Sequence, residues 1–242
     1  KTGQGHPDQW LGYMALWGLP SSTPLKVAGR DYTLGDLLSQ AMKDVRDGKE
    51  ASWTLMALST YLPPMQQWAQ DLKKKRMADN SKDNPDVWCL PIGLMQYHNH
   101  PQPRQIVQTK NLMLITYESN YGLRYIYLDG RPAPNNDPQP WWFGYSRGWF
   151  EGDTLVVETT NFRGDEKAGW LDVNGSPYTD ALKMTERFRR PNFGTLEIDV
   201  TIDDPKAYTK PFTVRVNQRI MVDEEMIEFI CNENEQSTKH IK

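Results

Sequence analysis

The spacing of hydrophobic residues changes near residue 80, from a period of three to four to a period of two. Before that point, apolar side chains fall on one helical face in four segments, at residues 6–17, 33–47, 52–62 and about 65–77. Gly or Pro follows each of the first three segments, and Thr33 and Ser52 are suited to cap the second and third. The pattern therefore predicts a helical N-terminal region over residues 1–79.

After residue 80, polar and apolar side chains alternate in a series of short runs. In the clearest run, Leu196, Ile198, Val200 and Ile202 alternate with polar residues, as in a strand with one buried face. Seven further strands are predicted at residues 105–118, 122–128, 143–150, 153–161, 182–190, 212–222 and 225–232. Short turns indicate hairpins at residues 151–153, 191–194 and 222–225.

Together these patterns predict an α+β fold, in which a helical N-terminal region precedes an antiparallel, meander-type sheet. A long meander avoids exposed edges by curling or closing. We therefore expect a curved sheet or a β-barrel of about eight strands over residues 80–242. The loop-forming sequence ADNSKDNPD marks the boundary between the two parts.

Composition and charge argue against several classes of function. The net charge is −3 with both signs interspersed, whereas a nucleic-acid surface needs a clustered basic face. No run approaches the roughly 20 apolar residues of a membrane span. The basic run Lys73–Arg76 is interpreted as the solvated end of a helix, with a phosphate or membrane patch as the alternative. GxSxG, GxGxxG and P-loop patterns are missing, and we expect no cofactor.

Motifs over roughly the last two-thirds of the chain resemble those of a known family. They are CLP at Cys89–Pro91, YE at Tyr117–Glu118, DGRP at Asp129–Pro132, GYSRGWFEGDTLVVETTNF at Gly144–Phe162, ALKMTERFRRPNFGTLEIDVTIDDPKAY at Ala181–Tyr208 and ICNEN at Ile230–Asn234. In combination they resemble a family of uncharacterised bacterial proteins that is common among acidobacteria. The resemblance implies a lipocalin-type barrel and an exported protein, secreted or periplasmic. It implies no particular chemistry.

Cys89 and Cys231 are the two cysteines, and sequence alone leaves open one disulfide or two buried thiols. The exported character that the resemblance implies favours an oxidising compartment. Both cysteines also lie in motif segments, CLP and ICNEN. We therefore predict that they form a disulfide.

His98 and His100 are the residues most suggestive of a metal site. In a strand, side chains two positions apart point the same way, so the two imidazoles could share one metal ion. However, Pro101 follows at once, and the remaining histidines, His6 and His240, lie near the ends of the sequence. We therefore predict a loop with exposed or hydrogen-bonded histidines and no metal, and keep the His98–His100 site as the weaker alternative.

Glu186 falls on an otherwise apolar strand face, between Met184 and Phe188. An unpaired carboxylate inside a barrel costs on the order of several kcal/mol. Arg187 points to the opposite face, so a partner must come from elsewhere, and we predict Arg124. Two interpretations stay open: a structural ion pair, or a pocket in which the carboxylate acts as general acid or base.

Two more polar residues are placed by strand alternation. Gln218 shares a strand face with Val214 and Val216, which places it inside the predicted barrel. Glu118 follows Leu114 on one side of another predicted strand and is a second candidate acid–base residue.

An aromatic group follows the proline-rich loop DGRPAPNNDPQP, at Trp141, Trp142, Phe143, Tyr145, Trp149 and Phe150. Proline stiffens such a loop, so its aromatic side chains lose little entropy when a ligand binds. A sugar or a flat aromatic ligand would suit the group. Hydrophobic closure of one end of the barrel is the alternative.

Three functions are therefore weighed. The first is an exported barrel that binds a small, partly apolar, aromatic or sugar-like ligand. The second is a metal-independent lyase, isomerase or hydrolase with Glu118 or Glu186 as the catalytic acid–base residue. The third is a non-catalytic subunit that docks a protein partner through the N-terminal helices. The candidate ligand-binding residues are Arg124, Arg187, Gln218, Tyr117, Trp141, Trp142, Tyr145 and Trp149.

Overall fold

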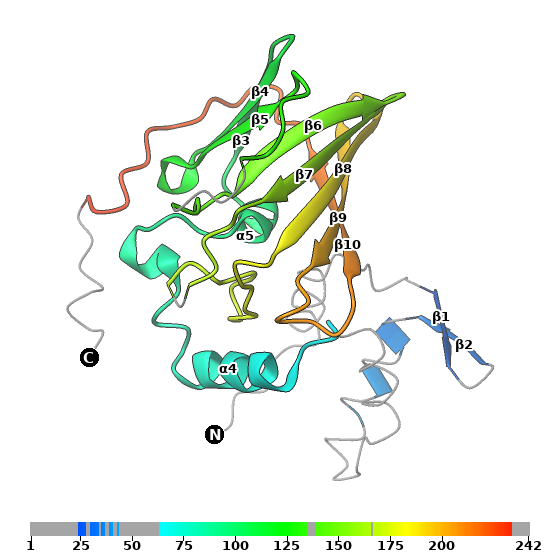
Figure 1. Ribbon diagram of the computed structural model, residues 1–242. Coiled ribbons are helices and arrows are strands. Elements are labelled where there is room, and N and C mark those ends of the chain that lie inside the picture. Colours follow the sequence, from blue (N-terminus) through cyan, green and yellow to red (C-terminus); the bar gives the residue numbers. More distant parts are fainter. Residues whose placement is uncertain are drawn as a thin grey trace. The chain divides into compact units, whose positions relative to one another are not determined.

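The chain forms two compact units, Lys1–Pro63 and Pro64–Lys242 (Figure 1). The computed structural model describes residues 24–27, 30–33, 35–36, 39–40, 43, 63–134, 139–165 and 167–233. The helices predicted at residues 6–17 and 52–62 lie outside the described residues, as does most of the one predicted at 33–47. The helical N-terminal region therefore stays a prediction.

In the first unit, β1 (Pro24–Val27) and β2 (Arg30–Thr33) form an antiparallel hairpin where the sequence pattern predicted no element. Thr33 caps the turn that follows, as predicted. Its Oγ1 accepts the backbone N–H of Asp36 at 3.1 Å, and its own N–H donates to the Asp36 carboxylate at 3.0 Å. This reciprocal pair of bonds is a capping box.

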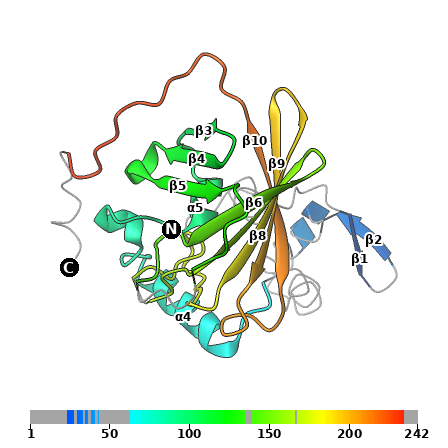
Figure 2. The same cartoon turned by 45° about the horizontal axis from the view of Figure 1, so that its top comes forward.

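The second unit is built on one eight-stranded sheet in the order β10-β9-β8-β7-β6-β5-β4-β3. Figures 1 and 2 show that the sheet curls into a half-barrel, which confirms the predicted curved, eight-stranded architecture. The strands are β3 (Arg104–Gln108), β4 (Leu112–Tyr117), β5 (Leu123–Tyr127), β6 (Tyr145–Glu151), β7 (Thr154–Thr160), β8 (Lys183–Asn192), β9 (Thr195–Asp203) and β10 (Phe212–Arg219).

One pairing departs from the predicted antiparallel meander. β5 and β6 run parallel, with Ile126 opposite Ser146, while the other neighbours in this sheet pair antiparallel. The long proline-rich connection between them allows the chain to return to the same end of the sheet, which a tight hairpin turn cannot do. The sheet is therefore mixed.

Two of the eight predicted strands are wrong in detail. The predicted strand 105–118 is two strands, because Thr109 turns the chain through bonds between its N–H and hydroxyl and the carbonyl of Leu112. The predicted strand 225–232 and its hairpin at 222–225 do not form. That segment instead crosses near β4, where Glu118 accepts the backbone N–H of Ile227 at 3.0 Å. A side chain therefore anchors this segment in place of a strand ladder.

The helix predicted at about residues 65–77 is confirmed as α4 (Gln67–Ala78). It is fixed beside the β9–β10 connection by Trp68, whose Nε1 donates to the carbonyl of Lys206 at 2.8 Å (Figure 1). Three short helices complete the unit: η1 (Pro85–Trp88), α5 (Leu94–Asn99) and η2 (Ser119–Tyr121). None of the helices described for this chain has both the length and the apolar character that crossing a membrane requires.

α5 occupies the concave side of the curled sheet. Its residues Leu94, Met95 and Tyr97 are part of the hydrophobic core. Tyr97 packs on Tyr117 of β4 with ring centroids 4.3 Å apart, while the amide of Gln218 on β10 lies 3.3 Å from a carbonyl oxygen of the same helix. α5 therefore contacts both ends of the sheet, and it fills the gap that a closed barrel would bridge by strand pairing.

Candidate functional site

A charged cluster lies inside the half-barrel and contains the pair predicted from strand alternation. Arg124 of β5 donates through Nη1 to Oε1 of Glu186 on β8 at 2.9 Å, and its Nη2 bonds the other carboxylate oxygen. Both side chains are buried, with 1% and 0% of their residue surface exposed. The inward register of Glu186 and its pairing with Arg124 are confirmed.

Short polar side chains on the two intervening strands allow Arg124 to reach Glu186. Nε of Arg124 donates to Ser146 Oγ at 3.1 Å, and Nη2 donates to Thr159 Oγ1 at 2.9 Å. Ser146 and Thr159 face each other across the β6–β7 ladder and are bonded at 2.9 Å. The guanidinium therefore crosses the inner face without leaving a polar gap.

His98 of α5 joins the cluster from the other side. Its Nε2 lies 2.6 Å from Glu186 Oε1, and its Nδ1 lies 3.1 Å from Nη1 of Arg104. A guanidinium can only donate, so Nδ1 accepts and Nε2 carries the proton that is donated to Glu186. Burial lowers the pKa of His98, and this effect outweighs the attraction of Glu186. His98 is therefore held as a neutral imidazole.

Glu186 stays ionised although it is buried. Burial by itself would raise the pKa of this carboxyl, but the charge of Arg124 and the hydrogen bond from His98 outweigh it and lower the pKa to about 2. The dominant stabilising contribution is the bidentate guanidinium, the geometry in which arginine binds a carboxylate most strongly.

Arg104 and Gln218 close the cluster at the two ends of the sheet. Nη2 of Arg104, on β3, donates to the carbonyl oxygens of Tyr97 and His98 at 2.8 and 3.1 Å. With its amide oxygen turned toward Arg104, Gln218 of β10 accepts from both terminal nitrogens at 2.8 and 2.9 Å. The predicted inward position of Gln218 is confirmed, and its partners are protein groups.

Glu118 and Arg187 are not part of this cluster. Glu118 is buried but bonds the backbone of Ile227. Arg187 is exposed on the outer face and pairs with Glu151 at 2.8 Å. Tyr117 does face inward, against Tyr97, and its buried hydroxyl makes no regular hydrogen bond within the described residues.

Part of the predicted aromatic group forms a stack on the outer face of β5 and β6. The ring of Tyr145 lies 5.1 Å from Tyr127 and 5.5 Å from Trp141, measured between centroids. The guanidinium of Arg131 covers Tyr127 at 4.1 Å. These contacts fasten the two ends of the proline-rich connection to the sheet.

The rest of the aromatic group lies apart from that stack. Trp142 packs against Arg163, with 4.9 Å between guanidinium and ring. Trp149 is exposed, and its Nε1 donates to Glu151 at 3.1 Å. A single aromatic binding surface is therefore not assembled from these residues, and a ligand role for them stays a prediction.

His98 and His100 do not converge. Residues 94–99 are helical rather than a loop or strand, and His98 points into the core. His100 instead lies with its Nε2 3.8 Å from a carboxylate oxygen of Asp86. Within the described parts of the chain, no three His, Cys, Asp or Glu side chains are grouped as metal ligands would be.

The predicted disulfide between Cys89 and Cys231 is confirmed. Cys89 directly follows η1, and it stands between Trp88 and Leu90, which both border a pocket. The disulfide therefore anchors the far C-terminal segment to one wall of that pocket.

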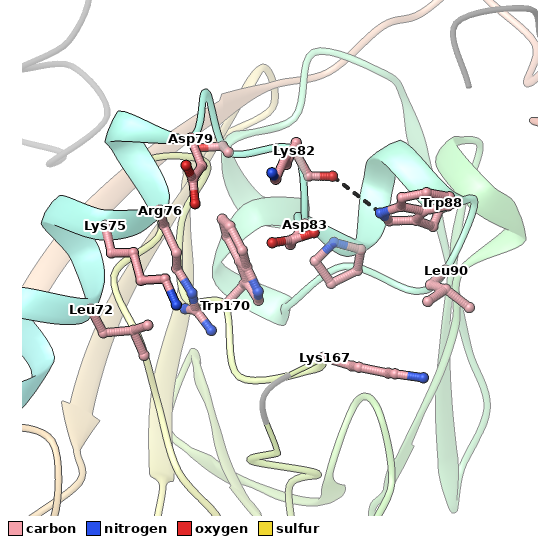
Figure 3. Close-up of a pocket in the computed structure, with 12 residues that line it drawn as sticks. Leu72, Lys75, Arg76, Asp79, Lys82, Asp83, Trp88, Leu90, Lys167 and Trp170 are labelled. Atoms are coloured by element: carbon pink, nitrogen blue, oxygen red, sulfur yellow. Dashed lines mark hydrogen bonds between the residues drawn. The ribbon is translucent and has the colours of Figure 1, made fainter. Parts of the chain in front are cut away.

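The pocket lies between α4, η1 and the segment around Trp170, and has a volume of about 560 Å³ (Figure 3). Its apolar walls are Leu72, Pro85, Trp88, Leu90 and Trp170. Its polar lining consists of Lys75, Arg76, Asp79, Ser81, Lys82, Asp83 and Lys167. It belongs wholly to the second unit, and none of the Arg124–Glu186 cluster borders it.

Arg76 corrects the interpretation of the basic run Lys73–Arg76 as solvated. It is 7% exposed, and its Nη1 donates to the carbonyl oxygens of Gly169 and Gly175 at 3.0 and 3.2 Å. Its guanidinium also lies 4.0 Å from the ring centre of Trp170. Arg76 turns inward because these carbonyls and the indole replace the water it would otherwise bind.

Comparison with known proteins gives no match of any kind. No family model matches the chain, and neither a curated protein nor a solved structure does. The resemblance based on the sequence motifs therefore stays a prediction.

The sequence pattern missed this pocket. Its lining comes from several separate stretches between Leu72 and Trp170, and no periodic pattern connects them. The basic run that contains Lys75 and Arg76 was the one available signal. Because a basic run also fits the end of a solvated helix, it did not distinguish a solvated helix end from the wall of a pocket.

Proposed function

We propose that the protein binds a small organic ligand with an aromatic or apolar part in the pocket between α4 and η1, without transforming it. The observation that carries this proposal is the pocket itself, with Trp88 and Trp170 among its walls. Its volume falls within the range of about 300–1,000 Å³ that small-molecule sites occupy.

The charged cluster supports binding over catalysis. His98 and Glu186, the best acid–base pair among the described residues, are buried and bonded to each other and to two arginines. Neither of them lines the pocket. The concave side, where the interior of the predicted barrel would lie, is occupied by α5 and the core. These arrangements favour a structural role for the cluster.

The Cys89–Cys231 disulfide supports placing this activity outside the cytoplasm, in the periplasm or the medium. Disulfides form and persist in oxidising compartments. A lipocalin-like fold belongs to the same proposal, with the half-barrel as its structural support.

Titration calorimetry with 1-naphthoate and 1-naphthamide tests the proposal. We expect at least one of these probes to saturate one site. The Trp88→Ala substitution should lower the affinity for that probe about tenfold, equivalent to about 1.4 kcal/mol. Trp149→Ala is the matched control, because Trp149 and Trp88 are similarly exposed, at 44% and 47%, and only Trp88 borders the pocket. Failure of both probes to bind, or equal loss in both variants, would contradict the proposal.

A further inference from the structure

The lining of the pocket carries more positive than negative charge. Four cations border it, Lys75, Arg76, Lys82 and Lys167, against the two carboxylates of Asp79 and Asp83. From this and the contacts below, we infer that the ligand is an aromatic carboxylate, whose ring meets the tryptophans and whose anionic group meets the basic side chains. The inference rests on the proposed function and names the chemical class that the site takes.

The three lysines of the pocket have no carboxylate partner among the described residues. Lys75, Lys82 and Lys167 form no ion pair within the part of the chain that the structure describes. Cations on the outer face of the sheet behave differently. Arg147 and Lys183 both pair with Glu158, at 2.6 and 2.5 Å. Three basic side chains at the pocket are therefore available to an anionic ligand.

Arg76 places a further basic group at the pocket, in a fixed orientation. Its guanidinium is held by the carbonyl oxygens of Gly169 and Gly175 and by the ring of Trp170. These contacts fix the orientation of the guanidinium beside the pocket. A preoriented charge loses little entropy when an anion arrives.

Trp170 supplies a second independent indication. Its indole is buried, and its Nε1–H has no hydrogen-bond partner among the described residues. An unsatisfied buried donor is unusual in a native protein. Figure 3 shows Trp170 among the basic side chains of the pocket, beside Arg76. A small movement of the ring would let this N–H donate to an anionic oxygen of the ligand.

The two aspartates favour a singly charged ligand. Asp79 and Asp83 border the same space, so each additional negative charge on a ligand meets repulsion as well as attraction. A carboxylate carries one charge, whereas a phosphate monoester carries about 1.5 to 2 at neutral pH. The mixture of basic and acidic side chains at the pocket therefore favours a carboxylate over a phosphate monoester.

Calorimetric titration of 1-naphthoate, 1-naphthamide and 1-naphthyl phosphate tests the inference on the full chain. We expect 1-naphthoate to bind at least tenfold more tightly than the isosteric amide in low salt. Raising the ionic strength should weaken the binding of 1-naphthoate and leave the affinity for 1-naphthamide unchanged. Equal affinity for both would overturn the inference while leaving the proposed function standing. Tighter binding of the phosphate would overturn the carboxylate assignment.

The double variant Lys82→Gln/Lys167→Gln locates the charge. Both lysines are exposed, so the variant should fold, and we expect it to reduce the preference for 1-naphthoate over the amide to less than threefold. Lys110→Gln, in the exposed turn between β3 and β4, is the matched control and should keep the full preference. An unchanged preference in the double variant would overturn the assignment to this pocket.

Discussion

Glu186 is a carboxylate that remains ionised without contact with water. Arg124 and His98 together replace its hydration, and both oxygens are bonded. Burying such an ion pair costs desolvation free energy. Removing one partner costs more, because the remaining charge is then buried and uncompensated. The residue-scale predictions follow from this asymmetry.

Glu186→Gln keeps the shape of the side chain and removes its charge. We expect the free energy of unfolding to fall by about 3–5 kcal/mol, because Arg124 stays buried without a counter-ion. Urea titration measures this change. Glu151→Gln is the control, since it breaks the exposed pair with Arg187 and should cost about 1 kcal/mol or less. Equal costs in the two variants would show that the cluster does not stabilise the fold.

The cluster also sets how stability depends on pH. The folded pKa of His98 lies below its ordinary value of 6.5, so the unfolded chain takes up the proton first as pH falls. Stability contributed by His98 is therefore present above about pH 6.5 and is lost as pH falls through and below that value. Glu186 adds a second loss of stability. It occurs as pH falls from the ordinary pKa of the carboxyl, 4.5, to its folded pKa of about 2.

We expect the free energy of unfolding to decrease from pH 7 to pH 5 by up to about 1.4 kcal/mol per pH unit, the limit for one group. His98→Gln, which cannot titrate, should flatten this part of the profile and leave the loss below pH 4.5 in place. Urea titrations across the pH range measure both. An identical slope in the variant and the parent chain would assign the dependence to another group.

Sequence reasoning reached the contact between Arg124 and Glu186 because strand alternation reports which way a side chain points. It did not predict that His98 bonds Glu186, because it placed His98 in a loop rather than in a helix of six residues. Five consecutive residues of α5 are buried, from Leu94 to His98. A helix covered on all sides has no amphipathic period, so its pattern cannot be distinguished from that of a buried strand or loop.

At the scale of elements, α5 connects the charged cluster to the pocket. His98 near its end bonds Glu186, while Gln96 donates through Nε2 to the carbonyl oxygen of Trp170 at 3.1 Å. Gly93 precedes the helix, and a Cβ at this position would fall on that same carbonyl. The position of Trp170 therefore depends on how closely α5 approaches it.

Gly93→Ala should force this contact apart. We expect a loss of about 1–3 kcal/mol in the free energy of unfolding, the usual cost of overpacking, and weaker binding of 1-naphthoate because Trp170 shifts. Gly194→Ala is the control, since a Cβ there meets nothing closer than 3.8 Å. Thermal melts and calorimetry of both variants check the expectation. If Gly93→Ala changes neither the stability nor the affinity for 1-naphthoate, the position of Trp170 does not depend on the approach of α5.

The parallel direction of β6 relative to β5 could not be predicted from the sequence either. Alternation in residues 143–150 shows which side chains share a face but carries no information about the direction of the neighbouring strand. The hydrophobic pattern is the same for a parallel and an antiparallel partner. Only the length of the connection after Tyr127 distinguishes them, and a proline-rich loop fits both.

At the scale of the whole molecule, the Cys89–Cys231 disulfide joins positions 142 residues apart. Reduction, or the double variant Cys89→Ser/Cys231→Ser, should lower the free energy of unfolding by about 2–5 kcal/mol. Because Trp88 and Leu90 flank Cys89 and border the pocket, we also expect weaker binding of 1-naphthoate. Urea titration and calorimetry with and without dithiothreitol measure these effects. Unchanged affinity in the reduced protein would show that the wall is held without the disulfide.

The closure of the half-barrel by α5 has a consequence for the order of folding. During synthesis, α5 and β5 are complete well before β8 and β10 supply Glu186 and Gln218. Until then Arg124 has no carboxylate to pair with, and burying it would be unfavourable. Contacts between such distant segments also slow folding. We therefore expect the second unit to stay unfolded until nearly all of it has been made, which is the condition in which a polypeptide can still be threaded through a narrow channel.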